Sequence, residues 1–116
     1  MSKNILEEKE EHLSALALDL GNGVILAISD GEYRVGTIAI GVPLTIEEKK
    51  TAAVTFPVFG TRNEIFAKSM AERTAHEMNR IAVVIISLKK AEEDSAKVYR
   101  LVRRILDKIR TPRGSS

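Results

Sequence analysis

The sequence predicts an α+β fold, in which an antiparallel sheet of about five to six strands carries two main helices in the order ββββαβα. Three observations indicate it: aliphatic residues alternate with other residues in the first half, two amphipathic stripes follow in the second half, and a short apolar run separates the stripes. Strands that come first, without repeated βαβ units, favour α+β. With 116 residues, we expect one domain over residues 1–110 and a flexible tail at 111–116.

The first two strands form a predicted hairpin. Leu16, Leu18 and Leu20 recur at every second position, which is typical of a strand that turns one face inward, so we expect these leucines in the core. The segment 21–23, Gly-Asn-Gly, tolerates positive φ and suits a tight turn. Residues 24–28 then form the second strand.

Two more strands are predicted before the first helix. Asp30-Gly31 is a turn signal, and residues 33–42 read as one long strand that Gly36 or Gly41 interrupts with a bulge. Pro43 ends this strand, and residues 45–50 form a polar loop or a short helical turn. Residues 52–58 alternate again, and Pro57 within them favours an edge position or a bulge.

The first helix and the strand after it have the clearest signals. Thr61 and Glu64 fit a capping box, so we expect the helix to begin at Arg62. Residues 81–86 are apolar on both faces, which predicts a central strand with both sides at least partly covered. Asp in place of Ile85 is therefore expected to unfold the domain.

The second helix is predicted after a polar run over residues 89–94, whose acids suit a helix N-terminus. Its inward stripe consists of Val98, Leu101, Val102, Ile105 and Ile109. Tyr99 and Leu106 widen this stripe beyond what one sheet face requires. Either a tilted helix buries the extra residues, or they meet a partner. We expect a homo-oligomer that uses the sheet edge or this helix.

Composition excludes several classes of protein. Cysteine is absent and there are two histidines, so we expect no disulfide, no metal and no cofactor. No apolar run approaches the roughly 20 residues that cross a bilayer, and no secretory signal follows Met1, which favours the cytoplasm. The absence of Gln, Cys and Trp together with abundant Glu, Lys and Arg resembles thermophile proteins.

No candidate catalytic constellation is complete, so we predict that the protein is not an enzyme. His12 and His76 each lack a second positioned group. Ser87 ends the central strand without a nucleophile-elbow motif around it. The glycines at 21–23 join two strands and match no phosphate-loop pattern. A small-ligand cleft between Ser87 and this turn remains an alternative.

The charge distribution offers another alternative. Residues 97–116 contain seven Lys or Arg and one acid, Asp107, whereas residues 1–12 contain four glutamates and two lysines. A basic C-terminal helix is typical either of a solvated face or of a nucleic-acid-binding module. The residues of such a module would be Arg100, Arg103, Arg104, Lys108 and Arg110.

The second half of the chain also resembles the proteasome assembly chaperone family, in the branch of the third and fourth eukaryotic chaperones and their archaeal relatives. The match covers about the last two-thirds of the chain, with a looser match at residues 25–28 and 35–36. It lies in Phe59-Gly60-Thr61, Ala67, Met70-Ala71, Arg73-Thr74, Val83 to Leu88, Val98, Leu101-Val102 and Ile105.

The resemblance implies a non-enzymatic scaffold that pairs with itself or a relative, binds proteasome α-subunits and helps the α-ring to form. Some archaeal relatives end in a hydrophobic-tyrosine-X tail that docks between α-subunits. The end of this chain, residues 110–116, has no tyrosine, and residues 112–115 within it resemble a protease-site remnant of an expression vector. On this interpretation, the expected partner-binding residues are Tyr99, Arg103, Leu106, Arg110, Glu47 and Lys49.

Overall fold

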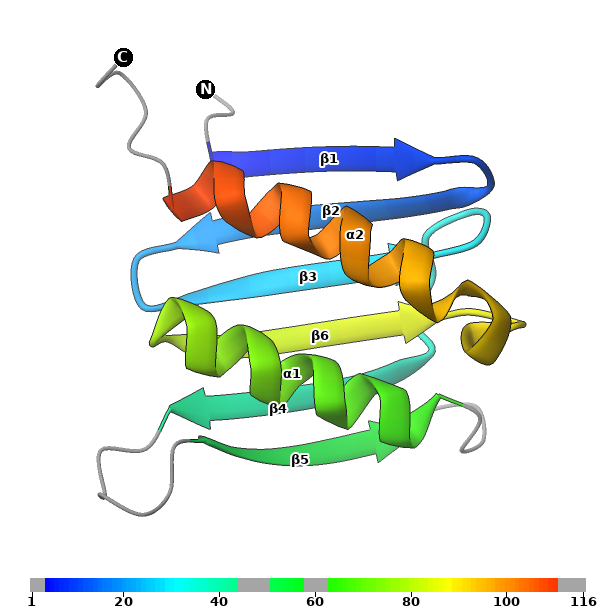
Figure 1. Cartoon of the computed structure of the whole chain (residues 1–116). Helices are drawn as coiled ribbons and strands as arrows, with labels where there is room; N and C mark the ends of the chain where they lie inside the picture. The colour runs from blue at the N-terminus through cyan, green and yellow to red at the C-terminus, as the bar shows by residue number, and fades with distance from the viewer. Residues whose placement is uncertain (1–3, 44–50, 58–62, 111–116) are drawn as a thin grey trace.

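The computed structural model describes residues 4–43 and 63–110 and the backbone path of residues 51–57. Six strands form one sheet in the order β1-β2-β3-β6-β4-β5, and both helices lie on the same face of it (Figure 1). The elements are β1 Ile5–Glu10, β2 Leu13–Leu20, β3 Gly23–Ser29, β4 Thr37–Pro43, β5 Thr51–Pro57, α1 Glu64–Met78, β6 Ile81–Ser87 and α2 Ala91–Arg110.

The α+β prediction is confirmed, and the sheet is mostly antiparallel. One pair departs from that rule, because β6 runs parallel to β3 on one side and antiparallel to β4 on the other. The predicted central position of β6 and edge position of β5 are both confirmed. Among the described residues, no helix is long and apolar enough to cross a membrane.

The first strand, β1, was not predicted from the sequence. Its six residues include three glutamates and a lysine, so no apolar alternation marks it. The turn into β2 contains no glycine that would mark it in the sequence. Glu11 adopts the positive φ of 58° that this turn needs. The strand forms because Glu8 and Glu10 point toward α2, where cations neutralise them.

The predicted strand over residues 33–42 is wrong at its start, because β4 begins at Thr37. The Ser29 hydroxyl donates to the Glu32 carbonyl at 2.8 Å and accepts from the Gly31 amide at 3.1 Å, which closes a turn instead of starting a strand. A Cβ on Gly36 would lie 2.4 Å from the Ile86 carbonyl oxygen. Glycine therefore allows this segment to pass close to β6.

The start of the first helix is also corrected, since α1 begins at Glu64 with Asn63 in the N-cap position. The Asn63 side chain does not cap the helix, because its Oδ1 accepts from the Leu88 amide at 3.2 Å and so ties α1 to the end of β6. Thr61 of the predicted capping box lies outside the described residues, as does the predicted loop at 45–50. Asn79, in the left-handed conformation, ends the helix.

The core lies between the sheet and the two helices. α2 crosses β1 and β2, and α1 crosses β4, β5 and β6. Small residues allow the close approach: Ala15 and Ala17 are fully buried, and a Cβ on Gly41 would lie 2.3 Å from the Ala71 carbonyl oxygen. The expectation that Leu16 and its neighbouring leucines point into this core is therefore wrong, because β2 turns its alanines toward α2.

Candidate protein interface

The face of the sheet opposite the helices is aliphatic over its central strands. We call it the open face, because neither described helix covers it (Figure 1). β6 was predicted to be at least partly covered on both sides, and its residues Val83 and Ile85 on the open face are half-buried although no described helix lies over them. The aliphatic residues of the open face are Leu16, Leu18, Leu20, Ile25, Ala27, Ile38, Ile40, Val42, Ile81, Val83 and Ile85.

The strand register gathers these side chains into continuous rows. In one row, Leu18 pairs with Ile25, Ile25 with Val83, and Val83 with Ile40. In the next, Leu16 pairs with Ala27, Ala27 with Ile85, and Ile85 with Ile38. Directly opposed residues on one face have touching side chains, so the rows form a single apolar surface across four strands.

The open face is partly exposed to solvent. Leu20 is 42% exposed, and Val42 and Ile81 are 39% exposed each, while the residues at the centre of the rows are half-buried by one another. Monomeric proteins rarely leave a continuous apolar surface of this kind uncovered. The open face is therefore a candidate protein interface.

Polar groups appear at the β1 end of the open face. Glu7 alternates with the inward-pointing Glu8 and so lies on the open side, where its carboxylate accepts from the Tyr33 hydroxyl at 2.8 Å. Burial raises the pKa of Tyr33 to about 12, and the hydrogen bond to Glu7 adds to this effect. A polar rim thus borders the apolar rows on one side.

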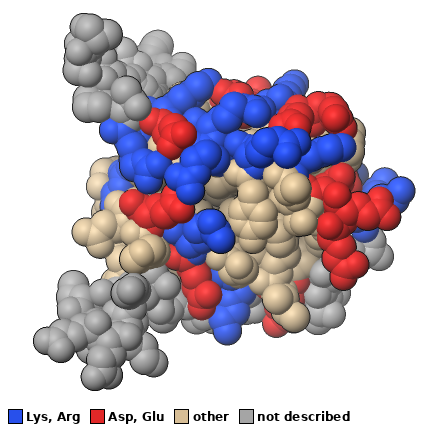
Figure 2. Space-filling model, viewed as in Figure 1, with Lys and Arg blue, Asp and Glu red and all other residues tan. Residues whose placement is uncertain are grey.

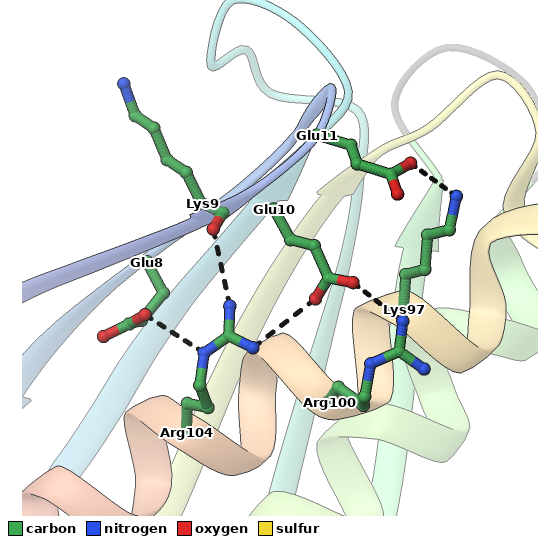
Figure 3. A network of polar contacts seen from close by, with 7 residues as sticks. All are labelled: Glu8, Lys9, Glu10, Glu11, Lys97, Arg100 and Arg104. Carbon is green, nitrogen blue, oxygen red and sulfur yellow. Dashed lines mark hydrogen bonds and ion pairs between the residues drawn. The ribbon is translucent and has the colours of Figure 1, made fainter.

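The helix side of β1 is a layer of paired charges, drawn in Figure 3. Arg100 donates to Glu10 at 2.7 Å, and Arg104 donates to Glu8 at 3.2 Å and also contacts Glu10. Lys97 reaches Glu11 at 2.6 Å, and Lys108 donates to the Glu8 carboxylate. Figure 2 shows these basic side chains interleaved with acidic ones over α2.

These pairs change the acid–base behaviour of β1. The hydrogen bond from Lys108 holds the pKa of Glu8 below its usual value of 4.5, and Arg104 adds to the shift. The hydrogen bond from Arg100 similarly lowers the pKa of Glu10. Because these cations face carboxylates, the nucleic-acid alternative loses much of the free positive charge on which it depends.

The partner-binding residues expected from the sequence divide into four groups, and Tyr99 forms the last of them. Leu106 is 1% exposed and belongs to the core, so the wide apolar stripe of α2 is explained by burial within the chain. Arg103 bonds Glu77 at 2.9 Å, and Arg110 bonds Asp107 at 2.7 Å, both on the helix surface. Glu47 and Lys49 lie outside the described residues.

Tyr99 remains partly buried between the helices. Its ring meets Phe66 edge-on, with centroids 5.8 Å apart, and the Arg73 guanidinium lies 4.9 Å from its centroid. Aromatic and cation–π contacts of this geometry hold the ring in place. Among the expected partner-binding residues that the structure describes, Tyr99 is thus the one with an apolar surface that borders the outside of the helix layer.

The alternative of a small-ligand cleft between Ser87 and the turn at residues 21–23 is wrong in its geometry. β3 and β6 are parallel, so Gly23 lies beside Ile81 at one end of the sheet and Ser87 lies beside Ser29 at the other. A hollow does adjoin Ser87, lined among others by Asn63. Its lining includes Asp30, Glu32 and Lys89 but no described histidine.

The two histidines have ordinary surroundings. The prediction that His12 lacks a partner is wrong, since its Nε2 lies 3.0 Å from the Asp94 carboxylate at the start of α2. This contact joins the turn after β1 to the helix. His76 is exposed in the last turn of α1. Among the described residues, no group of His, Asp and Glu is arranged to hold a metal ion.

Comparison with known proteins gives a likeness of fold. No protein-family model matches the chain, and no curated protein sequence matches it. The structure is similar to a solved structure described as a novel chaperone complex for yeast 20S proteasome assembly, with a TM-score of 0.59 and 17% sequence identity. The match covers 92% of this chain and 93% of that one. At this identity the likeness shows a shared fold.

Proposed function

We propose that this chain is a non-enzymatic, cytoplasmic chaperone that binds proteasome α-subunits and helps the α-ring to assemble. The observation that carries the proposal is the likeness of the whole fold to a chain of a proteasome assembly chaperone complex. Three family resemblances in the sequence, at residues 59–61, 83–88 and 98–105, agree with it. The apolar open face agrees too, since a chaperone works by contact with other polypeptides.

We further propose that a second copy of this chain covers the open face. On the open face, the four central strands carry no charged residue. Two copies can therefore stack without burying an unpaired charge. Six strands spaced about 4.8 Å apart and about seven residues long present roughly 600 Å² in projection. A standard interface takes about 800 Å² of accessible surface from each partner, so one sheet face supplies most of this area and the residues at its rim would supply the rest.

This pairing differs in place from the one expected from the sequence. The sheet edge and α2 were the expected contacts, but α2 uses its apolar stripe within the chain. Face-to-face packing of two sheets about 10 Å apart is the arrangement of β-sandwiches. The helices of both copies would then lie on the outside, available to a further partner.

Capture of α-subunits tests the function. The tagged chain is co-expressed with the proteasome α-subunits of the same organism, purified, and analysed by mass spectrometry. We expect one or more α-subunits to co-purify in a fixed ratio to the chain, and α-rings to form faster when the chain is present. Co-purification that yields no α-subunit above an untagged control contradicts the proposal.

Light scattering at micromolar concentration tests the pairing separately. The expected mass is twice the 12.8 kDa of one chain. A strict monomer at that concentration contradicts self-pairing, and a stable complex with a second, related chain shows that the open face serves a relative instead of a copy.

A further inference from the structure

A groove runs between the N-terminal halves of the two helices, on the outer side of the helix layer. It has a volume of about 520 Å³, and its walls come from the first turns of α1 and from the first half of α2. The residues that line it are Ile65, Phe66, Ser69, Ala91, Glu92, Ser95 and Tyr99. It lies on the opposite side of the sheet from the open face.

Ile65 marks one wall of the groove. It is 85% exposed, the largest exposure of any large apolar side chain that the structure describes. An isoleucine in this position contributes almost nothing to folding, because folding removes little of its surface from water. Its apolar side chain is available for contact with another molecule.

The floor of the groove is rigid and apolar. Phe66 and Tyr99 meet edge-on with an interplanar angle of 80°, and the Arg73 guanidinium packs over the Tyr99 ring. Held aromatic rings supply contact area at a small entropic cost, which is why such residues dominate the energetics of protein interfaces.

The charge of the groove is negative. Glu92 is its one charged lining residue, and no ion pair joins its carboxylate to a cation among the described residues. Glu8, Glu10 and Glu11, by contrast, all meet cations. Figure 2 shows an uncharged area between the charged side chains of the helix side. An apolar hollow with one acid at its wall complements an apolar side chain that has a cation beside it.

We propose that the groove receives one large aliphatic or aromatic side chain of a proteasome α-subunit, and that a Lys or Arg beside that side chain meets Glu92. This inference rests on the proposed function and adds the chemistry of the contact. Because the groove and the open face lie on opposite sides of the sheet, a paired molecule presents two such grooves, one from each copy.

Two groove variants and two matched controls test the proposal by α-subunit capture and by titration of the captured subunit. Ile65→Asp places a charge in the apolar wall, and Val35→Asp is its control, because Val35 is also an exposed aliphatic residue at 49% but lies outside the groove. Glu92→Lys reverses the groove charge. Glu93→Lys is its control, since both acids lie in the first turn of α2 and only Glu92 lines the groove.

We expect each groove variant to weaken α-subunit binding by about tenfold or more, as for central interface residues, and each control to stay within about twofold of the wild type. Circular dichroism should show the same fold in all four variants. Binding that survives both groove variants overturns the groove and leaves the chaperone function standing. A wild-type chain that captures no α-subunit overturns both.

Discussion

The two faces of the sheet are both apolar, yet they differ in the size of their side chains. Under the helices, the small residues Ala15, Ala17, Ala39 and Gly41 lie where the helices cross. On the open face, the same two strands, β2 and β4, carry leucine, isoleucine or valine. Residue size thus separates the two faces in β2 and β4, whereas β3 and β6 carry large aliphatic residues on both faces.

The physical reason is the distance of approach. How closely a helix packs depends on the size of the side chains at the contact. A large aliphatic residue at Ala17 or a Cβ at Gly41 would push the helix away, and at Gly41 the added atom would lie 2.3 Å from the Ala71 carbonyl oxygen. Large aliphatic residues on the open face suit the space of about 10 Å between two stacked sheets.

The sharpest way to break this comparison is to place a charge on the helix face. Ile86 is fully buried beneath the helices. Ile86→Asp should lower the free energy of unfolding by about 4 kcal/mol or more, because an unpaired carboxylate would be buried without a partner. Urea denaturation followed by circular dichroism measures the loss. A variant with wild-type stability would show that this face is accessible to water.

The substitution Ile85→Asp, one residue before Ile86, tests the other face of the same strand. Ile85 lies on the open face and is partly exposed, so Ile85→Asp should keep the fold with a loss of about 1 kcal/mol. The expectation from the sequence alone, that this change unfolds the domain, is thereby revised.

Ile85→Asp should instead abolish pairing, because a charge would be buried between two copies. Light scattering should report a folded monomer, with a dissociation constant raised by about a hundredfold or more. If Ile85→Asp and Ile86→Asp unfold the chain equally, the open face belongs to the core of a single copy and the pairing proposal fails.

Much of the fold could be predicted from local patterns. The hairpin at residues 21–23, the central strand that became β6 and both helices followed from turn chemistry and periodicity. These signals are local, because a turn or an amphipathic stripe depends on residues within a few positions of one another. The groove at Ile65 and Tyr99 joins two helices, and only Tyr99 was identified beforehand.

The rest depends on contacts between distant residues. β1 carries the pattern of a solvated segment, and its glutamates become strand residues only because α2, about 90 positions later, supplies cations. The alternation in β2 gave the right periodicity and the wrong face. Leucine is the more hydrophobic residue, so periodicity alone assigned it to the core, whereas helix packing selected Ala15 and Ala17.

A smaller effect is expected at the charged layer of β1. Glu8 and Glu10 have lowered pKa values in the folded chain, so their stabilisation is present above the ordinary value of 4.5 and is lost as pH falls through the folded values. Glu8→Gln should lower the melting temperature at neutral pH and flatten its fall in acid. Calorimetry across pH 2–7, roughly the range in which carboxylates titrate, measures both.

Glu7→Gln is the matched control for this layer, because Glu7 lies on the same strand and faces the open side. Added salt should shrink the difference between Glu8→Gln and the wild type, since ion pairs at a surface are screened. Equal effects of the two substitutions at every pH would mean that the charge pairs with α2 contribute nothing particular to stability.

The smallest effect concerns the rim of the open face. Burial, with the hydrogen bond to Glu7 second, raises the pKa of Tyr33 to about 12 from 10.0. The neutral phenol is therefore favoured by folding, and its contribution to stability is complete below pH 10 and declines as pH rises toward 12. Phenolate absorbance is measured against pH for the wild type and for Tyr33→Phe. The difference between the two curves gives the titration of Tyr33 alone. Glu7→Gln should lower this pKa only in part, because burial is the larger cause. A Tyr33 that ionises at its ordinary value would place the side chain in solvent and remove it from the rim.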